Sequence, residues 1–288
     1  MPRLSVPRSS VRLSELGELG LLAELERQGL AERIADDAAQ LGDGLVVTQD
    51  SLVEGVHFRF DWLSWRELGF RAAAVNISDL AASGARPEAL LVSVGLPGET
   101  ELDDVLSLYG GIAEAGVPVR GGDTTEAASV FVTVTAIGRA DRVPGRSDAL
   151  PGDKLVVTGP LGAAGAAFRE RRYARPPVRV EEGIELARDA HAMLDLSDGL
   201  ARDAGHIAAR SGCRLLIELD LVPLAPGATH EDLGFGEDYE LLAATPDPGE
   251  FTVIGRCEPG SGVEIRLEGR PVALSGWEHF ACAKRAEP

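Results

Sequence analysis

Three observations predict an α+β fold of two domains. The chain has 288 residues, enough for two ordinary domains, and 44% of them are hydrophobic. Its strand-like segments outnumber what a regular alternation of strands and helices would give, which disfavours a doubly wound sheet. Between Arg139 and Asp153 the composition shifts to Gly, Pro, Asp and Arg, as is typical of a domain boundary. We therefore expect a domain with a mixed sheet and helices over residues 1–140, and a sandwich-like α/β domain over residues 141–288.

Three helices and several strands are expected in the first domain. Apolar spacing after Ser14 predicts a helix that stops near Gly29, and the sequence SWRE at residues 64–67 has the form of a capping box. That box opens a second helix, which should close near Gly84 and which carries Asn76 and Asp79 on one face. The other expected segments are a helix from Thr100 and Asp103 to about Gly116, strands at 45–48, 89–96 and 130–136, a short apolar stretch at 117–119 and a glycine-rich turn at 120–125.

The second domain is expected to contain more strands than helices. Its short apolar runs are bounded by Gly, Pro and Asp, which is typical of strands that end in turns. The expected strands are 155–158, 215–219, 239–243, 251–254 and 263–267. The expected helices are one starting at Gly162, one over 181–193 and one over 199–210, with a proline-rich loop at 223–226.

Bulk composition excludes several classes of partner and location. Acidic residues outnumber basic ones 46 to 28, and the formal charge of −18 argues against nucleic acid or anionic membrane as the main partner. No apolar run approaches the roughly 18 residues of a membrane span, and the first residues lack the apolar centre of a secretory signal. The cysteines Cys213, Cys257 and Cys282 show no paired spacing, so neither a zinc site nor a disulfide framework is indicated. A cytoplasmic protein is expected.

The basic residues restrict how the protein could handle phosphate. Only Lys154 and Lys284 are lysines, so phosphate chemistry must depend on arginine, backbone amides and metal. The chain contains no G-x-x-x-x-G-K-[ST] loop, no protein-kinase catalytic loop and no G-x-S-x-G elbow. His57 is by default a histidine at a strand end that makes a structural hydrogen bond.

Acidic residues recur in short groups that suit a divalent cation. The groups are Asp36 with Asp37, Asp79 after Asn76, Asp123 in the sequence GGDTT, and Asp195 with Asp198 in the sequence DLSDG. Magnesium prefers oxygen ligands from a few carboxylates together with substrate phosphates. A lone Asp in a turn is more often an N-cap or an Asx-turn residue, but several groups together favour a shared metal site. We expect the segment 195–199 to be the second domain's contribution to that site, closing against the acidic residues of the first.

Ten stretches along nearly the whole chain carry a family likeness. They are ELGELGLLAEL near the start, ADDAA at 35–39, TQDSLVEGVHF at 48–58, AVNISDLAASGARP at 74–87, GGDTT at 121–125, GRS at 145–147, PGD at 151–153, LDLSDGL at 194–200, GEDYEL at 236–241 and GWEHF at 276–280. In this order they resemble the thiamine-monophosphate kinase family, which belongs to the ATP-binding superfamily of aminoimidazole ribonucleotide synthetase and selenophosphate synthetase.

The resemblance implies that ATP gives its γ-phosphoryl group to thiamine monophosphate, making thiamine diphosphate with the help of several Mg²⁺ ions. The acceptor phosphate already carries about −1.5 to −2 charges at neutral pH, so no general base or nucleophile is expected. By the same resemblance, the metal ligands are Asp37, Thr48, Asp50, Asp79, Asp123, Asp195 and Asp198. The residues that contact ATP are Tyr109, Gly122, Asp123, Arg146 and Ser197, and those that hold the thiamine part are His57, Glu237 and Trp277. The family also implies a homodimer in which strands of both N-terminal domains join in a barrel.

Some positions depart from the family pattern, and other functions stay open. Ala35 and Phe235 stand where the family usually has glycine, and Gln49 stands where it has a second threonine. The segments 158–179 and 223–234 are shorter than expected. A related ATP-dependent enzyme with a different acceptor is one alternative, although selenophosphate synthetase is disfavoured because it uses a cysteine or selenocysteine and a lysine near the N-terminus. A non-catalytic regulator that binds nucleotide or thiamine phosphate is the other.

Overall fold

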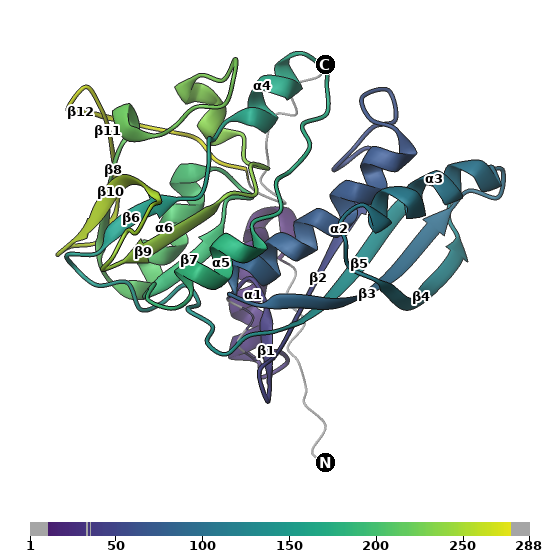
Figure 1. Ribbon diagram of the computed structural model, residues 1–288, viewed down its shortest axis with the longest axis horizontal. Coiled ribbons are helices and arrows are strands. Elements are labelled where there is room, and N and C mark those ends of the chain that lie inside the picture. The colour runs from purple at the N-terminus through teal and green to yellow at the C-terminus, as the bar shows by residue number, and fades with distance from the viewer. Residues whose placement is uncertain (1–10, 33, 35, 278–288) are drawn as a thin grey trace. The chain divides into compact units, whose positions relative to one another are not determined.

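The computed structural model describes residues 11–32, 34 and 36–277 (Figure 1). The chain divides into two compact units: one takes residues 35–276, and the other takes residues 1–34 and 277–288. In the smaller unit, helix α1 (Leu13–Arg27) kinks at Gly17, where φ is 71°. Arg12, and not Ser14, is its N-cap, because the Glu15 carboxylate accepts a hydrogen bond from the Arg12 N–H at 3.1 Å. The predicted helix therefore exists but begins before Ser14.

The first half of the larger unit forms a five-stranded mixed sheet. Its order is β1 (Ala39–Gly42), β2 (Leu45–Val53), β5 (Phe131–Arg139), β3 (Arg86–Leu96) and β4 (Val119–Glu126). The β3–β4 pair is parallel and the other pairs are antiparallel. Strand β1 was not predicted, although the sequence Asp43-Gly44 between it and β2 is a hairpin signal, and both residues have the positive φ that such a turn requires.

Helices α2 (Trp65–Ala82) and α3 (Leu102–Ala113) cover one face of this sheet. The two helices cross in close contact through glycines. A Cβ atom on Gly69 would lie 1.9 Å from the Leu108 carbonyl oxygen, and one on Gly111 would lie 1.9 Å from the Arg66 carbonyl oxygen. Neither position can therefore hold a side chain without moving a helix backbone.

The second half forms a seven-stranded mixed sheet. Its order is β12 (Arg270–Val272), β11 (Gly262–Leu267), β8 (Arg214–Glu218), β10 (Thr252–Glu258), β6 (Lys154–Val157), β9 (Leu241–Thr245) and β7 (Ala192–Asp195). Only the β8–β11 pair is parallel among the described residues. Helix α6 (Leu200–Ser211) packs on one face, and α5 (Val180–Leu186) packs on the other. Helix α4 (Ala163–Arg169) and the 3₁₀ turns η1 (Leu219–Leu221) and η2 (His230–Gly234) connect these elements.

Helix α2 packs against both sheets (Figure 1). Its residues from Leu68 to Leu80 pack in the core of the first sheet, while Ala81 and Ala82 pack with Met193 and Leu241 of the second. Small side chains allow this close approach, since a Cβ on Gly183 of α5 would lie 2.2 Å from the Ala81 carbonyl oxygen. The helix is consequently buried along nearly its whole length from residue 68 onward.

The expected α+β fold is confirmed, with two mixed sheets and six α-helices among the described residues. None of these helices is long and apolar enough to span a membrane. The domain boundary between residues 139 and 153 stays a prediction.

Two predicted elements were wrong. The segment 120–125 is not a turn but part of strand β4, because Gly122 allows its backbone to approach β3 closely: a Cβ there would lie 1.7 Å from the Val92 carbonyl oxygen. The helix predicted over 181–193 ends at Leu186, and residues 192–195 are strand β7. Its apolar run fits a buried strand as well as a helix, and tertiary pairing with β9 decides for the strand.

The helix contact at Gly69 gives a testable prediction. Gly69→Ala should lower the free energy of unfolding by about 2 kcal/mol or more, because the added methyl group overlaps the backbone of α3. Gly205→Ala in α6 is the control: its Cβ would meet nothing within 4 Å, so it should raise stability by about 0.5–1 kcal/mol. Urea unfolding of both variants measures the difference, and equal effects would contradict the packing described.

Candidate functional site

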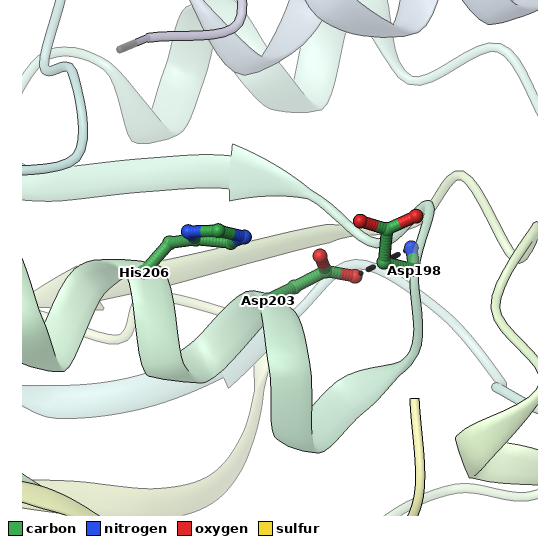
Figure 2. Close-up of side chains that lie close together, drawn as sticks. All are labelled: Asp198, Asp203 and His206. Carbon is green, nitrogen blue, oxygen red and sulfur yellow. Dashed lines mark hydrogen bonds between the residues drawn. The ribbon is translucent and has the colours of Figure 1, made fainter. Parts of the chain in front are cut away.

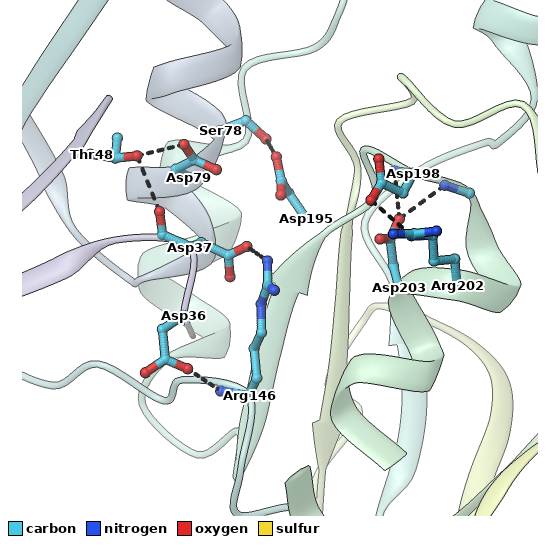
Figure 3. A network of polar contacts seen from close by, with 11 residues as sticks. Asp36, Asp37, Thr48, Ser78, Asp79, Arg146, Asp195, Asp198, Arg202 and Asp203 are labelled. Atoms are coloured by element: carbon cyan, nitrogen blue, oxygen red, sulfur yellow. Dashed lines mark hydrogen bonds and ion pairs between the residues drawn. The ribbon is translucent and has the colours of Figure 1, made fainter. Parts of the chain in front are cut away.

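Three carboxylates from distant parts of the chain come together between the two sheets. Asp37 precedes β1, Asp79 lies on α2 and Asp195 ends β7. One carboxylate oxygen of each lies within 4.8 Å of the others (Figure 3). We call these three residues the acidic centre. The structure thus brings Asp195 of the second half of the chain next to Asp37 and Asp79 of the first, as expected from the sequence.

Strand β2 meets the acidic centre through a threonine. Thr48 Oγ1 lies 2.7 Å from Asp79 Oδ2 and 3.1 Å from the Asp37 carbonyl oxygen. The neighbouring Asn76 of α2 is fully buried, and its Oδ1 accepts a hydrogen bond of 2.8 Å from the Asp50 N–H. Asn76 therefore fixes β2 against α2, and this contact holds Asp50 next to the centre.

A serine that the sequence did not single out links α2 to the second sheet. Ser78 is buried, and its Oγ donates a hydrogen bond of 2.6 Å to Asp195 Oδ2. Serines inside helices commonly bond to a carbonyl of their own helix, so no local pattern reveals this partner. Thr48 and Ser78 donate hydrogen bonds to Asp79 and Asp195, but they do not neutralise the negative charge of these carboxylates.

The acidic centre concentrates negative charge. Burial raises the pKa of Asp79 well above its usual value, and the charges of Asp50, Asp195 and Asp37 raise it further. Burial and the charge of Asp37 raise the pKa of Asp195 to about 7, although Ser78 and Arg146 oppose the rise. Crowded carboxylates of this kind are stabilised by a bound cation. Because all the donors are oxygen atoms, the centre suits a hard ion such as magnesium.

Arg146 lies beside the acidic centre in the segment that enters the second half. Its guanidinium forms an ion pair with Asp37, and its N–H donates to Asp36 Oδ1 at 3.0 Å. Burial lowers the pKa of Arg146, but the charge of Asp37 and a hydrogen bond to it raise the pKa by more. Its Nε is buried and has no hydrogen-bond partner among the described residues. An arginine in this state has a donor left for an anionic ligand.

Asp198 belongs to a second group, with Asp203 and His206 (Figure 2). Asp203 Oδ2 accepts hydrogen bonds from the Asp198 and Gly199 N–H groups at 3.0 and 3.1 Å, so it holds the start of α6. Burial and nearby arginine charges lower the pKa of His206 to about 4, which keeps it neutral at pH 7. The Asp198 carboxylate pairs with Arg202 at 3.1 Å. Asp195 and Asp198, three residues apart, therefore join different groups (Figure 3).

The turn at 195–199 is bonded to the GEDYEL segment. The Glu237 N–H donates to the Ser197 carbonyl at 2.8 Å, and the Tyr239 N–H donates to the Leu196 carbonyl at 2.9 Å. Gly236 is required there, because φ is 85° and a Cβ would lie 2.3 Å from the Ser197 carbonyl oxygen. These bonds bring Ser197, a predicted ATP contact, next to Glu237, a predicted thiamine contact.

The other acidic residues of this segment have structural partners. Both carboxylate oxygens of Asp238 accept from the Gly162 N–H at 2.9 Å, at the start of α4. Glu240 forms an ion pair with Arg179 at 2.7 Å and accepts from Thr158 Oγ1 at 2.6 Å. Only the side chain of Glu237 is substantially exposed, at 34%.

His57 and Glu237 approach each other through Arg71 of α2, which the sequence did not single out. Arg71 donates to the His57 carbonyl at 2.8 Å and forms an ion pair with Glu237. His57 Nδ1 accepts a hydrogen bond of 3.0 Å from the Val53 N–H, so a neutral His57 carries its proton on Nε2. The structural hydrogen bond expected of this histidine is confirmed.

Four predicted site residues lie apart from these groups or outside their unit. Gly122 and Asp123 lie on β4, all of whose residues are exposed, at the edge of the first sheet. Asp50 and Gly122 are separated by β5 and β3, which amounts to roughly 14 Å of sheet. Tyr109 is half-buried on α3 and packs in the core of the first sheet. Trp277 belongs to the smaller unit, so its role stays a prediction.

Phe235, a departure from the family pattern, takes part in an aromatic row. Its ring centroid lies 4.8 Å from that of Phe168 on α4, and Phe168 lies 5.2 Å from Trp62. Trp62 follows His57 in the chain, and Phe235 precedes Glu237. The row therefore joins the two segments that carry the predicted thiamine contacts.

Known proteins are similar to this chain over nearly its full length. A family model described as AIR synthase related protein, N-terminal domain, matches residues 35–140. The thiamine-monophosphate kinase of Aquifex aeolicus is 32% identical over 94% of this chain and 100% of its own length. This chain belongs to the thiamine-monophosphate kinase family. The thiamine-monophosphate kinase of Mycobacterium tuberculosis is 34% identical, over 96% of this chain and 95% of its own.

A solved structure of a thiamine-monophosphate kinase has the same fold. The structure described as AaThiL complexed with AMPPCP and TMP has a TM-score of 0.84 and 31% identity, over 95% of this chain and 100% of that one. The resemblance drawn from the ten motifs is therefore confirmed, and the two sheets described above are the fold of this family.

The crowding of charge predicts a gain in stability on removing one carboxylate. At pH 8, with a chelator present, Asp79→Asn should raise the free energy of unfolding by about 1 kcal/mol, because one buried negative charge is lost. A carboxyl whose pKa is raised by folding stabilises the protein while it is protonated, and this stabilisation is lost as pH rises through the raised pKa. For Asp195 the loss occurs between the ordinary value of 3.8 and about 7.

The gain from Asp79→Asn should therefore vanish at pH 4, below the raised pKa of Asp79, where this carboxyl is protonated in the wild type. Asp141→Asn, at an exposed position, should leave stability unchanged at both pH values. Thermal unfolding with a chelator measures all three proteins. An Asp79→Asn variant less stable than the wild type at pH 8 would contradict the crowding of charge described above.

Proposed function

We propose that this protein transfers the γ-phosphoryl group of ATP to the phosphate of thiamine monophosphate, in the cytoplasm, forming thiamine diphosphate. Family membership supports this reaction, and the related AaThiL structure is complexed with AMPPCP and TMP. The observation that carries the proposal is the acidic centre, whose like charges call for a divalent cation. ATP is used as its magnesium complex, so such a centre is suited to phosphoryl transfer.

The chemistry requires positioning and charge neutralisation more than proton transfer. Both reactants are anions, and the acceptor oxygen is already deprotonated at neutral pH. Bound magnesium supplies the positive charge that offsets their repulsion. Asp37, Asp79 and Asp195 would hold it, and Thr48 and Asp50 add further oxygen atoms beside them. Arg146, whose buried Nε has no partner among the described residues, would bind a phosphate oxygen of the nucleotide.

The acceptor would lie with its phosphate toward the acidic centre and its thiamine part toward His57 and Glu237. The hydrogen bonds between the 195–199 turn and residues 236–239 place these two regions side by side. Trp277 stays a predicted thiamine contact, because a positively charged thiazolium favours an aromatic ring.

We also propose that two copies of the chain form the working enzyme. Strand β4 is an exposed edge strand, and such edges are normally covered by another strand or by a partner. It carries Gly122 and Asp123, which lie too far from Asp50 within one chain to share a metal with it. A second copy covering β4 would let Asp123 serve the acidic centre of its partner.

A product assay tests the reaction. The purified protein with Mg-ATP and thiamine monophosphate should form thiamine diphosphate and ADP in equal amounts. Chromatography measures both products. Asp79→Asn should lower kcat at least about 100-fold, because a metal ligand is lost, and Asp141→Asn should be as active as the wild type. If the protein binds nucleotide but forms no thiamine diphosphate, the result would favour a non-catalytic regulator. Turnover of ATP with another phosphate acceptor alone would favour a different enzyme of the superfamily.

Mixed dimers test the shared site. Asp79→Asn and Asp123→Asn should each be inactive alone. After the two are unfolded and refolded together, about a quarter of the wild-type activity should return, because half of the dimers are mixed and each has one intact site. Light scattering should give the mass of two chains. An active Asp123→Asn variant, or no recovery in a proven mixed dimer, would contradict the proposal.

A further inference from the structure

Arg71 is a buried cation in the middle of α2, with partners from both halves of the larger unit. Only 6% of its side chain is exposed. One guanidinium nitrogen donates to the His57 carbonyl at 2.8 Å, and the other pairs with the Glu237 carboxylate. These partners are 180 residues apart in the sequence, and the Arg71 side chain contacts both of them.

Backbone hydrogen bonds fix the main chain of both partners, but they do not fix the side chain of Glu237. The His57 segment turns back on itself, since the His57 N–H donates to the Val53 carbonyl at 2.9 Å. Glu237 has a φ of 59° between Gly236 and Asp238, and its N–H is bonded to Ser197. That backbone sets where the Glu237 side chain starts, and Arg71 sets where its carboxylate points.

The exposed fractions of the Glu237 and Arg71 side chains show which of the two lies nearer to solvent. The Glu237 side chain is 34% exposed and that of Arg71 is 6% exposed, so Arg71 lies behind the carboxylate as seen from solvent. A ligand that reaches this place would meet the Glu237 side chain before the guanidinium. Burial raises the pKa of Glu237, while the charge of Arg71 and its hydrogen bond lower it. Arg71 thus also favours the ionised carboxylate, which accepts hydrogen bonds.

We propose that Arg71 is a positioning residue for the thiamine end of the site, holding the Glu237 carboxylate and the His57 segment in one geometry. The inference rests on the proposed function, because it takes these two residues to contact thiamine monophosphate. Arginine is suited to this role, since its planar guanidinium directs several donors at fixed angles, whereas lysine offers a single point charge. The acidic centre has its own supports in Thr48, Asn76 and Ser78 and does not depend on Arg71.

Steady-state kinetics of Arg71 variants test the proposal. Arg71→Met should raise the KM for thiamine monophosphate about 10-fold or more, while the KM for ATP and kcat change less than about twofold. Arg71→Lys should give an intermediate KM, because it keeps the charge but cannot hold both partners. Arg66→Met is the matched control: Arg66 lies on the same helix, is 58% exposed and pairs with Glu114, so the variant should behave as the wild type.

A double variant separates positioning from general damage. In a Glu237→Gln background, Arg71→Met should raise the KM for thiamine monophosphate much less than in the wild type, because its main partner is already altered. Equal effects in the two backgrounds, equal rises in both KM values, or an unchanged KM in Arg71→Met would each overturn the inference. If Arg71→Met does not fold, Arg71→Lys decides, and a wild-type KM there overturns it. A wild type without product would instead refute the proposed function.

Discussion

The burial of helix α2 on two sides is the constraint on which the rest of the structure depends. A helix in a protein of this size usually packs with one face and leaves the other to solvent. Here Leu68 to Leu80 fill the core of the first sheet, while Ala81 and Ala82 pack against the second. Alanine and glycine at the contacts, with Gly111 and Gly183 on the neighbouring helices, let the backbones approach closely enough for both packings at once.

Because α2 is shared, its polar residues can bond to elements of both halves. Asn76 reaches β2, Ser78 reaches β7, and Arg71 reaches the GEDYEL segment. Asp79 is held between these bonds at a depth where its negative charge is unfavourable. The apolar packing of the helix therefore fixes the polar centre, whose carboxylates are unfavourably close to one another. Such crowded carboxylates lower the stability of the metal-free protein, and a bound cation would offset their repulsion.

Much of the fold and part of the site could be predicted from the sequence. The capping box at Ser64 gave the start of α2, and the spacing of Asn76 and Asp79 indicated a functional face. Strand β4 was missed because glycines usually end strands, whereas here Gly122 permits close pairing with β3. The helix predicted over 181–193 was wrong in its second half, because residues 192 and 193 belong to strand β7, which only a distant partner, β9, defines.

Sequence analysis missed three supporting residues, Ser78, Arg71 and Asp203, for two physical reasons. Ser78 and Arg71 each bond to a partner that lies far away in the sequence. Arg71 and Glu237 are 166 positions apart, and Ser78 and Asp195 are 117 apart. Asp203 has nearby partners, but an aspartate within a helix is ordinarily a solvated surface residue. Motif comparison indicated the predicted ligand contacts, and only the structure showed the residues that bond to them.

Helix α2 also has a consequence for the order in which the chain can fold. A chain is made from its N-terminus, so α2 and the first sheet emerge from the ribosome well before β7 and β9. Until those strands are made, the flank of α2 at Ala81 and Ala82 has no partner from the second sheet. During synthesis the first half therefore has an apolar flank that stays without this partner until the second half has been made.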